Sequence, residues 1–250
     1  MTNTEQNLWL ILAQAISGEE ISLADFDDDE ILKQANLHGI PQLLNSQVQA
    51  GILSGVSDGL IGQLKSESFR SAAFDMTLNA ATRKTLDLLA ENEIPALLMK
   101  GTPVAHLYYP TTYLRTRCDT DIYINEDDLE KATVLLSANN YQITRSGKRK
   151  ISSKQFVAAM PSVQGTYIHF DVHWKLSNRV MFRHTLPFDE CLASSQPIPA
   201  LGPSAVALSK KDLLIHACIH RIAHGRNTQR NRLIWLYDIH LVFEAMDELE

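Results

Sequence analysis

A short apolar run that ends in a Lys-Gly-Thr turn, followed by two aspartates that open a second apolar run, constrains the fold of this chain more than any other feature. The first run covers Pro95 to Met99 and stops at Lys100-Gly101-Thr102. The second begins at Asp119-Thr120-Asp121 and continues as Ile122-Tyr123-Ile124. This pattern predicts a strand, a turn, a helix and a second strand headed by two carboxylates. Because successive side chains of a strand point to opposite faces, Asp119 and Asp121 share one face.

A third carboxylate, Asp171, lies in the middle of another predicted strand, residues 166–174. Alternation along this strand places His169, Asp171 and His173 on one face and apolar side chains on the other. If this strand pairs beside the one that starts at Asp119, three acids converge. Neighbouring carboxylates repel one another unless a cation lies between them, and Mg²⁺ takes oxygen ligands. Two such ions about 4 Å apart suit phosphoryl and nucleotidyl transfer.

Composition and charge narrow the class of protein. The chain has 250 residues, is 45% hydrophobic and carries a net charge of −6, so we expect a globular protein without an extended nucleic-acid surface. Its three cysteines form no CxxC pair, which favours a reducing compartment over a zinc or redox site. The N-terminal segment lacks the basic region and the cleavage site of a signal peptide, and its apolar run is too short to span a membrane. We therefore expect a cytoplasmic protein without a membrane partner.

Helical periodicity divides the chain into three regions. We expect an N-terminal helical region at 1–92, an α/β core at 93–185 and a C-terminal helical region at 186–250. The fold class is α+β, with a small mixed sheet flanked by helices. A long helix is expected from about residue 60 to residue 91, with a stripe of buried side chains. The expected stripe consists of Leu64, Phe69, Ala73, Met76, Ala80, Leu86 and Leu89.

Histidines offer an alternative metal chemistry. Three of them, His216, His220 and His224, follow one another at helical i, i+4, i+8 spacing. Adjacent pairs of this kind can bind zinc, and the strand that carries Asp171 between two histidines is a second candidate. The first and third helical histidines lie about 12 Å apart by helix rise, so one ion cannot use all three. Packing, hydrogen-bonding or nucleotide-stacking roles are favoured over a zinc-dependent hydrolase.

Other charged residues near the acids have two interpretations each. Lys100 pairs either with a phosphate or with the carboxylates. Arg115 and Arg117 either neutralise the two aspartates or contact a triphosphate bidentately. Asp238 interrupts an apolar helix face, where a buried hydrogen bond to a neighbouring helix is expected. Cys118 lies beside the acids, but no base is spaced to activate it.

Four segments together resemble a known family. They are Lys100-Gly101, Arg115-x-x-x-Asp119-Thr120-Asp121-Ile122, Phe170-Asp171-Val172-His173-Trp174 and Leu233-Ile234-Trp235-Leu236-Tyr237-Asp238-Ile239. In this order they resemble the uncharacterised nucleotidyltransferase family of the polymerase-β-like superfamily. In that superfamily a Gly-Ser or Gly-Gly turn binds the triphosphate, an Asp-x-Asp pair binds two Mg²⁺ ions, and a third acid on a neighbouring strand completes the site.

The resemblance implies roles for seven residues. Asp119 and Asp121 would hold both Mg²⁺ ions, and Asp171 would hold the catalytic ion and take the proton of the acceptor hydroxyl. Nucleotide binding would fall to Lys100, Gly101, Thr102 and Arg115. The implied reaction moves a nucleoside monophosphate from a nucleoside triphosphate (NTP) such as ATP to a hydroxyl-bearing acceptor, with release of pyrophosphate. The acceptor, whether small molecule, protein or RNA, is left open. The alternative is a catalytically inactive nucleotide- or partner-binding protein with the same fold.

Overall fold

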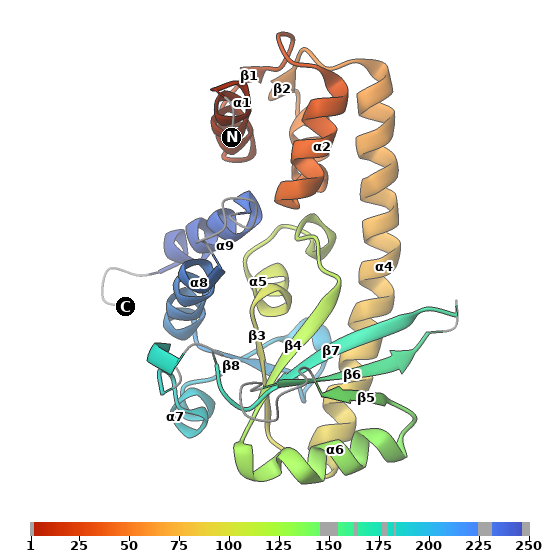
Figure 1. The fold of residues 1–250 in the computed structure, drawn as a ribbon, viewed down its shortest axis with the longest axis vertical. Helices are drawn as coiled ribbons and strands as arrows, with labels where there is room; N and C mark the ends of the chain where they lie inside the picture. The colour runs from red at the N-terminus through yellow and green to blue at the C-terminus, as the bar shows by residue number, and fades with distance from the viewer. Residues whose placement is uncertain are drawn as a thin grey trace.

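The computed structural model describes residues 3–145, 155–162, 165–176, 180–182, 184–224 and 232–246. Helices from the N-terminal part of the chain lie at one end of the molecule, and a mixed sheet lies at the other (Figure 1). The long helix α4 (Asp58–Glu91) runs from one end to the other along an edge. The fold is α+β, as the sequence predicts. Within the described residues, no helix combines the length and the apolar character needed to cross a membrane.

The N-terminal helices begin and end at residues suited to those positions. Asp27 caps the start of one helix by accepting the amides of Asp29 and Glu30, and Gly39 ends it with φ of 72°. Ser57 caps α4 by accepting the amide of Leu60. The other elements here are α1 (Asn3–Ile16), β1 (Ile21–Ser22), α2 (Asp28–His38), α3 (Pro41–Gln49) and β2 (Leu53–Ser54), with β1 and β2 paired in parallel.

Among the described residues, seven strands form the main sheet, in the order β5-β6-β7-β4-β3-β9-β8. Their bounds are β3 (Ala96–Met99), β4 (Asp119–Ile124), β5 (Gln142–Arg145), β6 (Gln155–Pro161), β7 (Tyr167–His173), β8 (Gln196–Pro197) and β9 (Val206–Ala207). Strands β4 and β7 are parallel neighbours, and Asp121 lies directly opposite Asp171. The short strands β8 and β9 come from the range that the sequence assigns to a C-terminal helical region. The division into three regions remains a prediction.

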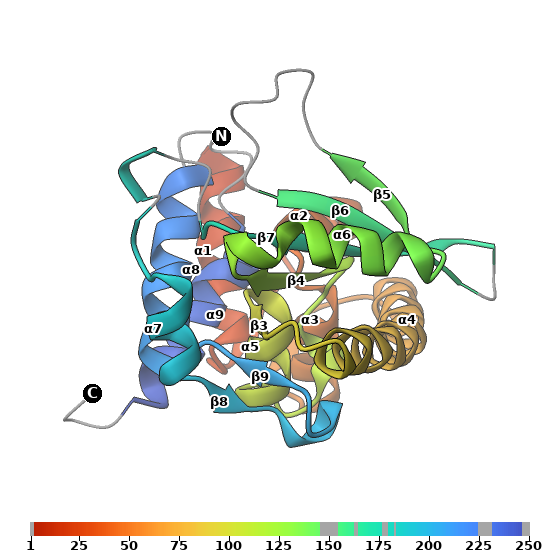
Figure 2. The same cartoon turned by 90° about the horizontal axis from the view of Figure 1, so that it is seen from below.

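Helices cover both faces of the sheet (Figure 2). The apolar face, with Ile122, Phe170 and Val172, packs against α4 and α6 (Leu129–Ala138). On the opposite face Leu97, Met99 and Tyr123 belong to the cluster that includes residues of α5, α7, α8 and α9. These four helices span Gly101–Leu107, Phe188–Ala193, Lys210–His224 and Leu233–Glu244, and 3-10 turns span Thr112–Leu114, Glu126–Asp128, Val180–Phe182 and Pro199–Leu201. The acids of β4 and β7 therefore face the second set of helices.

The expected buried stripe of α4 is wrong in its central part. Leu64, Leu86 and Leu89 are buried, but the four residues between them are exposed: Phe69, Ala73, Met76 and Ala80. The centre of the buried face instead includes polar side chains that have specific partners. Asp75 pairs with Arg117, Thr82 bonds Thr120 at 3.0 Å, and Thr85 bonds Tyr141 at 2.8 Å. Hydrophobic periodicity predicts the wrong face here, because hydrogen bonds offset the free-energy cost of burying these polar side chains.

A buried ion pair ties the C-terminal helix α9 to the segment that leads into β4. Both oxygens of Asp238 accept from Arg115, at 2.7 to 2.9 Å. The hydroxyl of Tyr109 donates to the same carboxylate at 2.9 Å. The expected buried hydrogen bond of Asp238 is present, but its donors come from the connection between α5 and β4 rather than from a neighbouring helix.

Removing one partner of this pair is expected to destabilise the fold. Asp238→Asn leaves the guanidinium of Arg115 buried without its counter-charge, and such a loss costs about 3–5 kcal/mol. Urea denaturation of Asp238→Asn measures this loss. The exposed Glu244 lies on the same helix, so Glu244→Gln serves as the control and should denature like the wild type. A loss below about 1 kcal/mol for Asp238→Asn, the size of an exposed pair, would contradict the expectation.

Candidate active site

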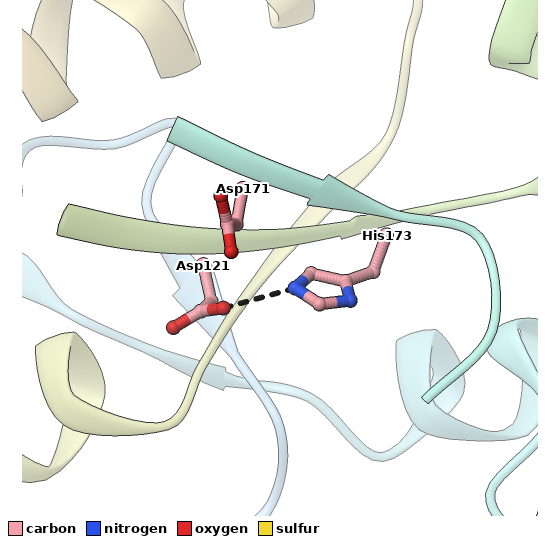
Figure 3. Close-up of side chains that lie close together, drawn as sticks. All are labelled: Asp121, Asp171 and His173. Atoms are coloured by element: carbon pink, nitrogen blue, oxygen red, sulfur yellow. Dashed lines mark hydrogen bonds and ion pairs between the residues drawn. The ribbon is translucent and has the colours of Figure 1, made fainter. Parts of the chain in front are cut away.

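The parallel pairing of β4 with β7 builds the centre of the candidate site. Asp121 comes from β4, and Asp171 and His173 come from β7. One ligand atom from each of these three side chains lies within 4.8 Å of the other two (Figure 3). Nε2 of His173 is 2.9 Å from Oδ1 of Asp121. The structure thus brings together two of the three predicted acids, with a histidine as the third member of the group.

Asp119 lies at the edge of this group rather than inside it. It begins β4 on the same face as Asp121, and its register partner in β7 is His169. Its side chain lines the cavity described below and is half-buried. Burial, together with the charges of Asp121 and Asp171, raises the pKa of Asp119 to about 6. A nearby cation would stabilise the ionised carboxylate and lower this pKa.

Lys100 supplies the positive charge of the cluster. Its ammonium contacts Oδ1 of Asp121 and lies 3.4 Å from Nε2 of His173. Burial opposes the charge of Lys100, but the nearby carboxylates, Asp121 foremost, raise its pKa above the ordinary value. Likewise burial works against the charge of Asp121, yet Lys100 and His173 hold the pKa of this carboxyl well below its usual range. Asp121 and Lys100 therefore form a charged pair.

The backbone at Lys100 is strained. This residue has φ of 60° and ψ of −131°, a conformation that non-glycine residues rarely adopt and that costs on the order of 1–3 kcal/mol. It lies between the end of β3 and the start of α5. The surrounding structure maintains this conformation, and the side chain is directed to the acids. Such strain is typical of functional sites.

The other two members of the cluster are held by burial and hydrogen bonds. Burial, followed by the charge of Asp121, raises the pKa of Asp171. Nε2 of Gln155 donates to Oδ2 of Asp171 at 2.8 Å, which orients the carboxylate. Burial, followed by the charge of Lys100, lowers the pKa of His173, so the imidazole is neutral near pH 7. A neutral imidazole can act as a metal ligand.

Gly101 makes room for a guanidinium. A Cβ atom at this position would lie 3.3 Å from the guanidinium carbon of Arg115, closer than an ordinary contact. The guanidinium is fixed by Asp238 and also donates to the carbonyl of Thr116 at 2.6 Å. Both Gly101 and Arg115 line the cavity. The glycine thus has a structural reason to be present, apart from any contact with a phosphate.

Thr102 and Arg117 lie beneath the site. The hydroxyl of Thr102 is buried, accepts from Arg117 at 3.1 Å and donates to Thr120 at 3.4 Å. Arg117 forms its ion pair with Asp75 of α4. The described ion-pair partners of Arg115 and Arg117 are therefore Asp238 and Asp75, not the two aspartates of β4. The role of Thr102 in nucleotide binding stays a prediction; in this structure its hydroxyl is hydrogen-bonded to Arg117 and Thr120.

A cavity of about 220 Å³ opens beside the acids, lined by residues of β4, α5, α8 and α9. Asp119, Asp121 and Lys100 line one part of it. The wall from the C-terminal helices combines apolar and aromatic side chains with two charged ones, and it consists of Leu213, His216, Ala217, His220, Arg232, Trp235 and Asp238. The rings of His220 and Trp235 meet edge to face, with centroids 4.7 Å apart. The cavity therefore joins a charged part to an aromatic part.

The helical histidines pack in this wall. Burial, followed by the charge of Lys100, lowers the pKa of His216 to about 3. The rings of His216 and His220 are 6.2 Å apart and tilted, and in the described part of the chain neither belongs to a metal-binding group. The side chain of His224 lies outside the described residues. Packing, hydrogen bonding or nucleotide stacking stays the interpretation favoured over zinc, and both His216 and His220 line the cavity.

The sequence assigns no site role to Arg232 or Trp235. It offers His173 and His216 only as zinc candidates, with packing, hydrogen-bonding or nucleotide-stacking roles favoured. A signal existed for His173, because alternation places it on the same face as Asp171. For Trp235 the signal was its place in the fourth segment of the family resemblance. No local pattern in the sequence indicates that α8 and α9 approach the start of β4, since this contact joins segments far apart along the chain.

The raised pKa of Asp119 predicts a stability that depends on pH. The unfolded carboxyl titrates near 3.8 and the folded one near 6, so ionising Asp119 costs stability as the pH rises through this window. With metal removed by chelation, Asp119→Asn should be more stable to urea than the wild type at pH 7.5, and this gain should disappear near pH 4. The control Asp189→Asn changes an exposed acid. An equal or lower midpoint for Asp119→Asn at pH 7.5 would contradict the interpretation.

Comparison with known proteins places these residues in a family. The solution structure of the antibiotic-resistance factor ANT(2'')-Ia is similar, with a TM-score of 0.47 and 12% sequence identity over 69% of this chain and 86% of that chain. No curated protein matches the chain. The family model described as "Uncharacterised nucleotidyltransferase" matches residues 24–250, a range that includes every residue of the site. The chain therefore belongs to the uncharacterised nucleotidyltransferase family.

Proposed function

We propose that this nucleotidyltransferase uses Mg²⁺ to move a nucleoside monophosphate from an NTP to a hydroxyl-bearing acceptor, with release of pyrophosphate. One observation carries the proposal: the register of β4 and β7 gathers Asp121, Asp171 and His173 around one point. Family membership supports nucleotidyl transfer in general. The metal, the donor nucleotide and the acceptor class are the specific parts of the proposal.

The residues present fit a divalent cation. Two carboxylate oxygens and an imidazole nitrogen lie within 4.8 Å of one another, close enough to share one ion. The ammonium of Lys100 already lies among these donors, which supports the idea that the group accommodates a positive charge. Asp119 and Asp121 would hold both ions, and Asp171 would also hold the catalytic one. When bound, Mg²⁺ would neutralise charge on the phosphates.

The chain's own residues would bind and orient the reactants. Asp171, whose Oδ2 is held by Gln155, would take the proton of the acceptor hydroxyl. Lys100 and Arg115 line the cavity next to the acids and would bind the triphosphate, and Gly101 lies against the guanidinium of Arg115. A contact from Thr102 would require its hydroxyl to leave Arg117. ATP is one candidate donor.

The acceptor would bind between the sheet and the C-terminal helices. The wall formed by α8 and α9 combines Leu213, Ala217 and Trp235 with His220 and Arg232. Apolar and aromatic surface beside a few polar groups is typical of a binding site for an organic molecule. Small molecules, proteins with an exposed hydroxyl side chain and RNA ends are the classes to compare.

Loss of Asp171 is expected to abolish transfer. Loss of a general base lowers the rate about 10²- to 10⁴-fold, so the rate of transfer by Asp171→Asn should fall at least a hundredfold. Asp121→Asn should be inactive because it loses metal binding. The assay follows labelled ATP, GTP, CTP and UTP with pools of small-molecule, protein and RNA acceptors. Asp189→Asn, at an exposed acid of α7, is the matched control and should keep wild-type activity.

The outcomes of this assay separate the enzyme from a binder. Labelled product from the wild type and the control, but not from the two site variants, supports the proposal. An Asp171→Asn variant as active as the wild type would remove that residue from the mechanism. If calorimetry detects uptake of an NTP without its consumption in any pairing, the protein is an inactive nucleotide binder.

Replacing Lys100 is expected to change metal and nucleotide binding in opposite directions. In Lys100→Met the ammonium no longer competes for Asp121, so Mn²⁺ should bind more tightly than to the wild type without nucleotide. The variant should bind NTP more weakly, because a cation for the phosphates is lost. Titration calorimetry measures both affinities, with Lys131→Met at an exposed site of α6 as the control. Equal or weaker Mn²⁺ binding by Lys100→Met would overturn this role.

A further inference from the structure

One face of α4 is apolar and exposed over five turns. The exposed residues recur at alternating spacings of four and three, and we call them the α4 stripe: Gly62, Ser66, Phe69, Ala73, Met76 and Ala80. Phe69 is 78% exposed and Met76 is 75% exposed. The helix lies at an edge of the molecule in both views (Figures 1 and 2). Large apolar side chains exposed in a row typically mark an interaction site.

The spacing indicates what kind of partner fits. Positions that alternate by four and three residues lie along one side of a helix and form the seam between two packed helices. The stripe holds two large side chains, Phe69 and Met76, separated by small ones. A partner helix must therefore offer small side chains opposite the large ones.

We propose that the α4 stripe binds a second copy of this chain, with the two α4 helices antiparallel about a two-fold axis level with residue 71. This axis places Phe69 opposite Ala73 of the second copy, Met76 opposite Ser66, and Gly62 opposite Ala80. Each large side chain meets a small one, and each contact occurs twice, as two-fold symmetry requires. A parallel pair would place Phe69 against Phe69 and Met76 against Met76.

Charge at the ends of the stripe favours the same arrangement. The axis that aligns the apolar positions also places Asp58 opposite Lys84 of the second copy, at both ends of the contact. Both side chains are exposed in the single chain. In a parallel pair Lys84 would face Lys84 and Asp58 would face Asp58. Opposite charges in the antiparallel pair therefore add to the match in size.

The size of the stripe sets the strength of the dimer. From Gly62 to Ala80 the helix is about 27 Å long. One helix face of this length is smaller than the roughly 800 Å² per partner of a standard stable interface. The dimer is therefore weak and forms as the concentration rises. The proposal does not depend on the proposed reaction, because the stripe lies on the side of α4 opposite Asp75 and Thr82.

Analytical ultracentrifugation of the whole chain tests the proposal. From low to high micromolar concentration the weight-average mass should rise from that of a monomer toward that of a dimer. Ala73→Glu places a charge against Phe69 of the second copy and should keep the protein monomeric, and Met76→Lys should do the same. The matched control Ala90→Glu changes an exposed alanine at the end of the same helix and should leave the dimer intact. Circular dichroism checks that each variant is folded.

Charge exchange tests the orientation. Asp58→Lys should weaken the dimer by repulsion from Lys84, and Asp58→Lys combined with Lys84→Asp should restore it. A wild type that stays monomeric at every concentration would overturn the proposal, whether or not another protein binds the stripe. A dimer that survives both Ala73→Glu and Met76→Lys would also overturn it. A dimer unaffected by the charge exchange would exclude the antiparallel arrangement.

Discussion

The parallel pairing of β4 with β7 is the constraint on which the site depends. It sets Asp121 directly against Asp171 and brings His173 to the same point. Partial burial, followed by the nearby charge of Asp121, makes the ionised form of Asp171 costly and raises its pKa. The ammonium of Lys100 offsets part of this cost at the expense of a strained backbone. The fold therefore keeps an unfavourable charge cluster that a cation can relieve.

Two buried ion pairs hold the segment that leads into β4, next to this cluster. Arg115 and Asp238 join the entrance of β4 to α9, and Arg117 and Asp75 join the same segment to α4. The guanidinium of Arg115 also lies against Gly101, so one side chain links the C-terminal helix to the Lys-Gly turn. The first pair thus fixes one wall of the cavity, and the second fixes α4, to the segment that leads into the strand carrying Asp119 and Asp121. Neither of these two pairs uses the carboxylates of Asp119, Asp121 or Asp171.

The helix α4 departs from the usual arrangement of an amphipathic helix. Part of its buried face is polar, because Asp75, Thr82 and Thr85 find partners in the core. Its exposed face carries Phe69 and Met76. One helix therefore supports the site from below and presents an apolar surface outward. In the proposed dimer each α4 would lie between its own active site and the second copy.

The sequence by itself determined the features that depend on local periodicity. Alternation assigned Asp119 and Asp121 to one face of a strand, and Asp171 and His173 to one face of another, because a strand repeats every two residues. The family resemblance named the acids in their order. Neither indicated that Arg115 and Arg117 pair with Asp238 and Asp75, nor that α4 buries polar side chains.

Only the tertiary structure decided those pairings, as well as the register that brings Asp121 to Asp171 and the approach of α8 and α9 to the acids. The physical reason is that a side chain's face follows from its immediate neighbours along the chain. Its partner, in contrast, depends on which distant segments meet, and the free energy of a buried charge or hydroxyl is settled by that partner.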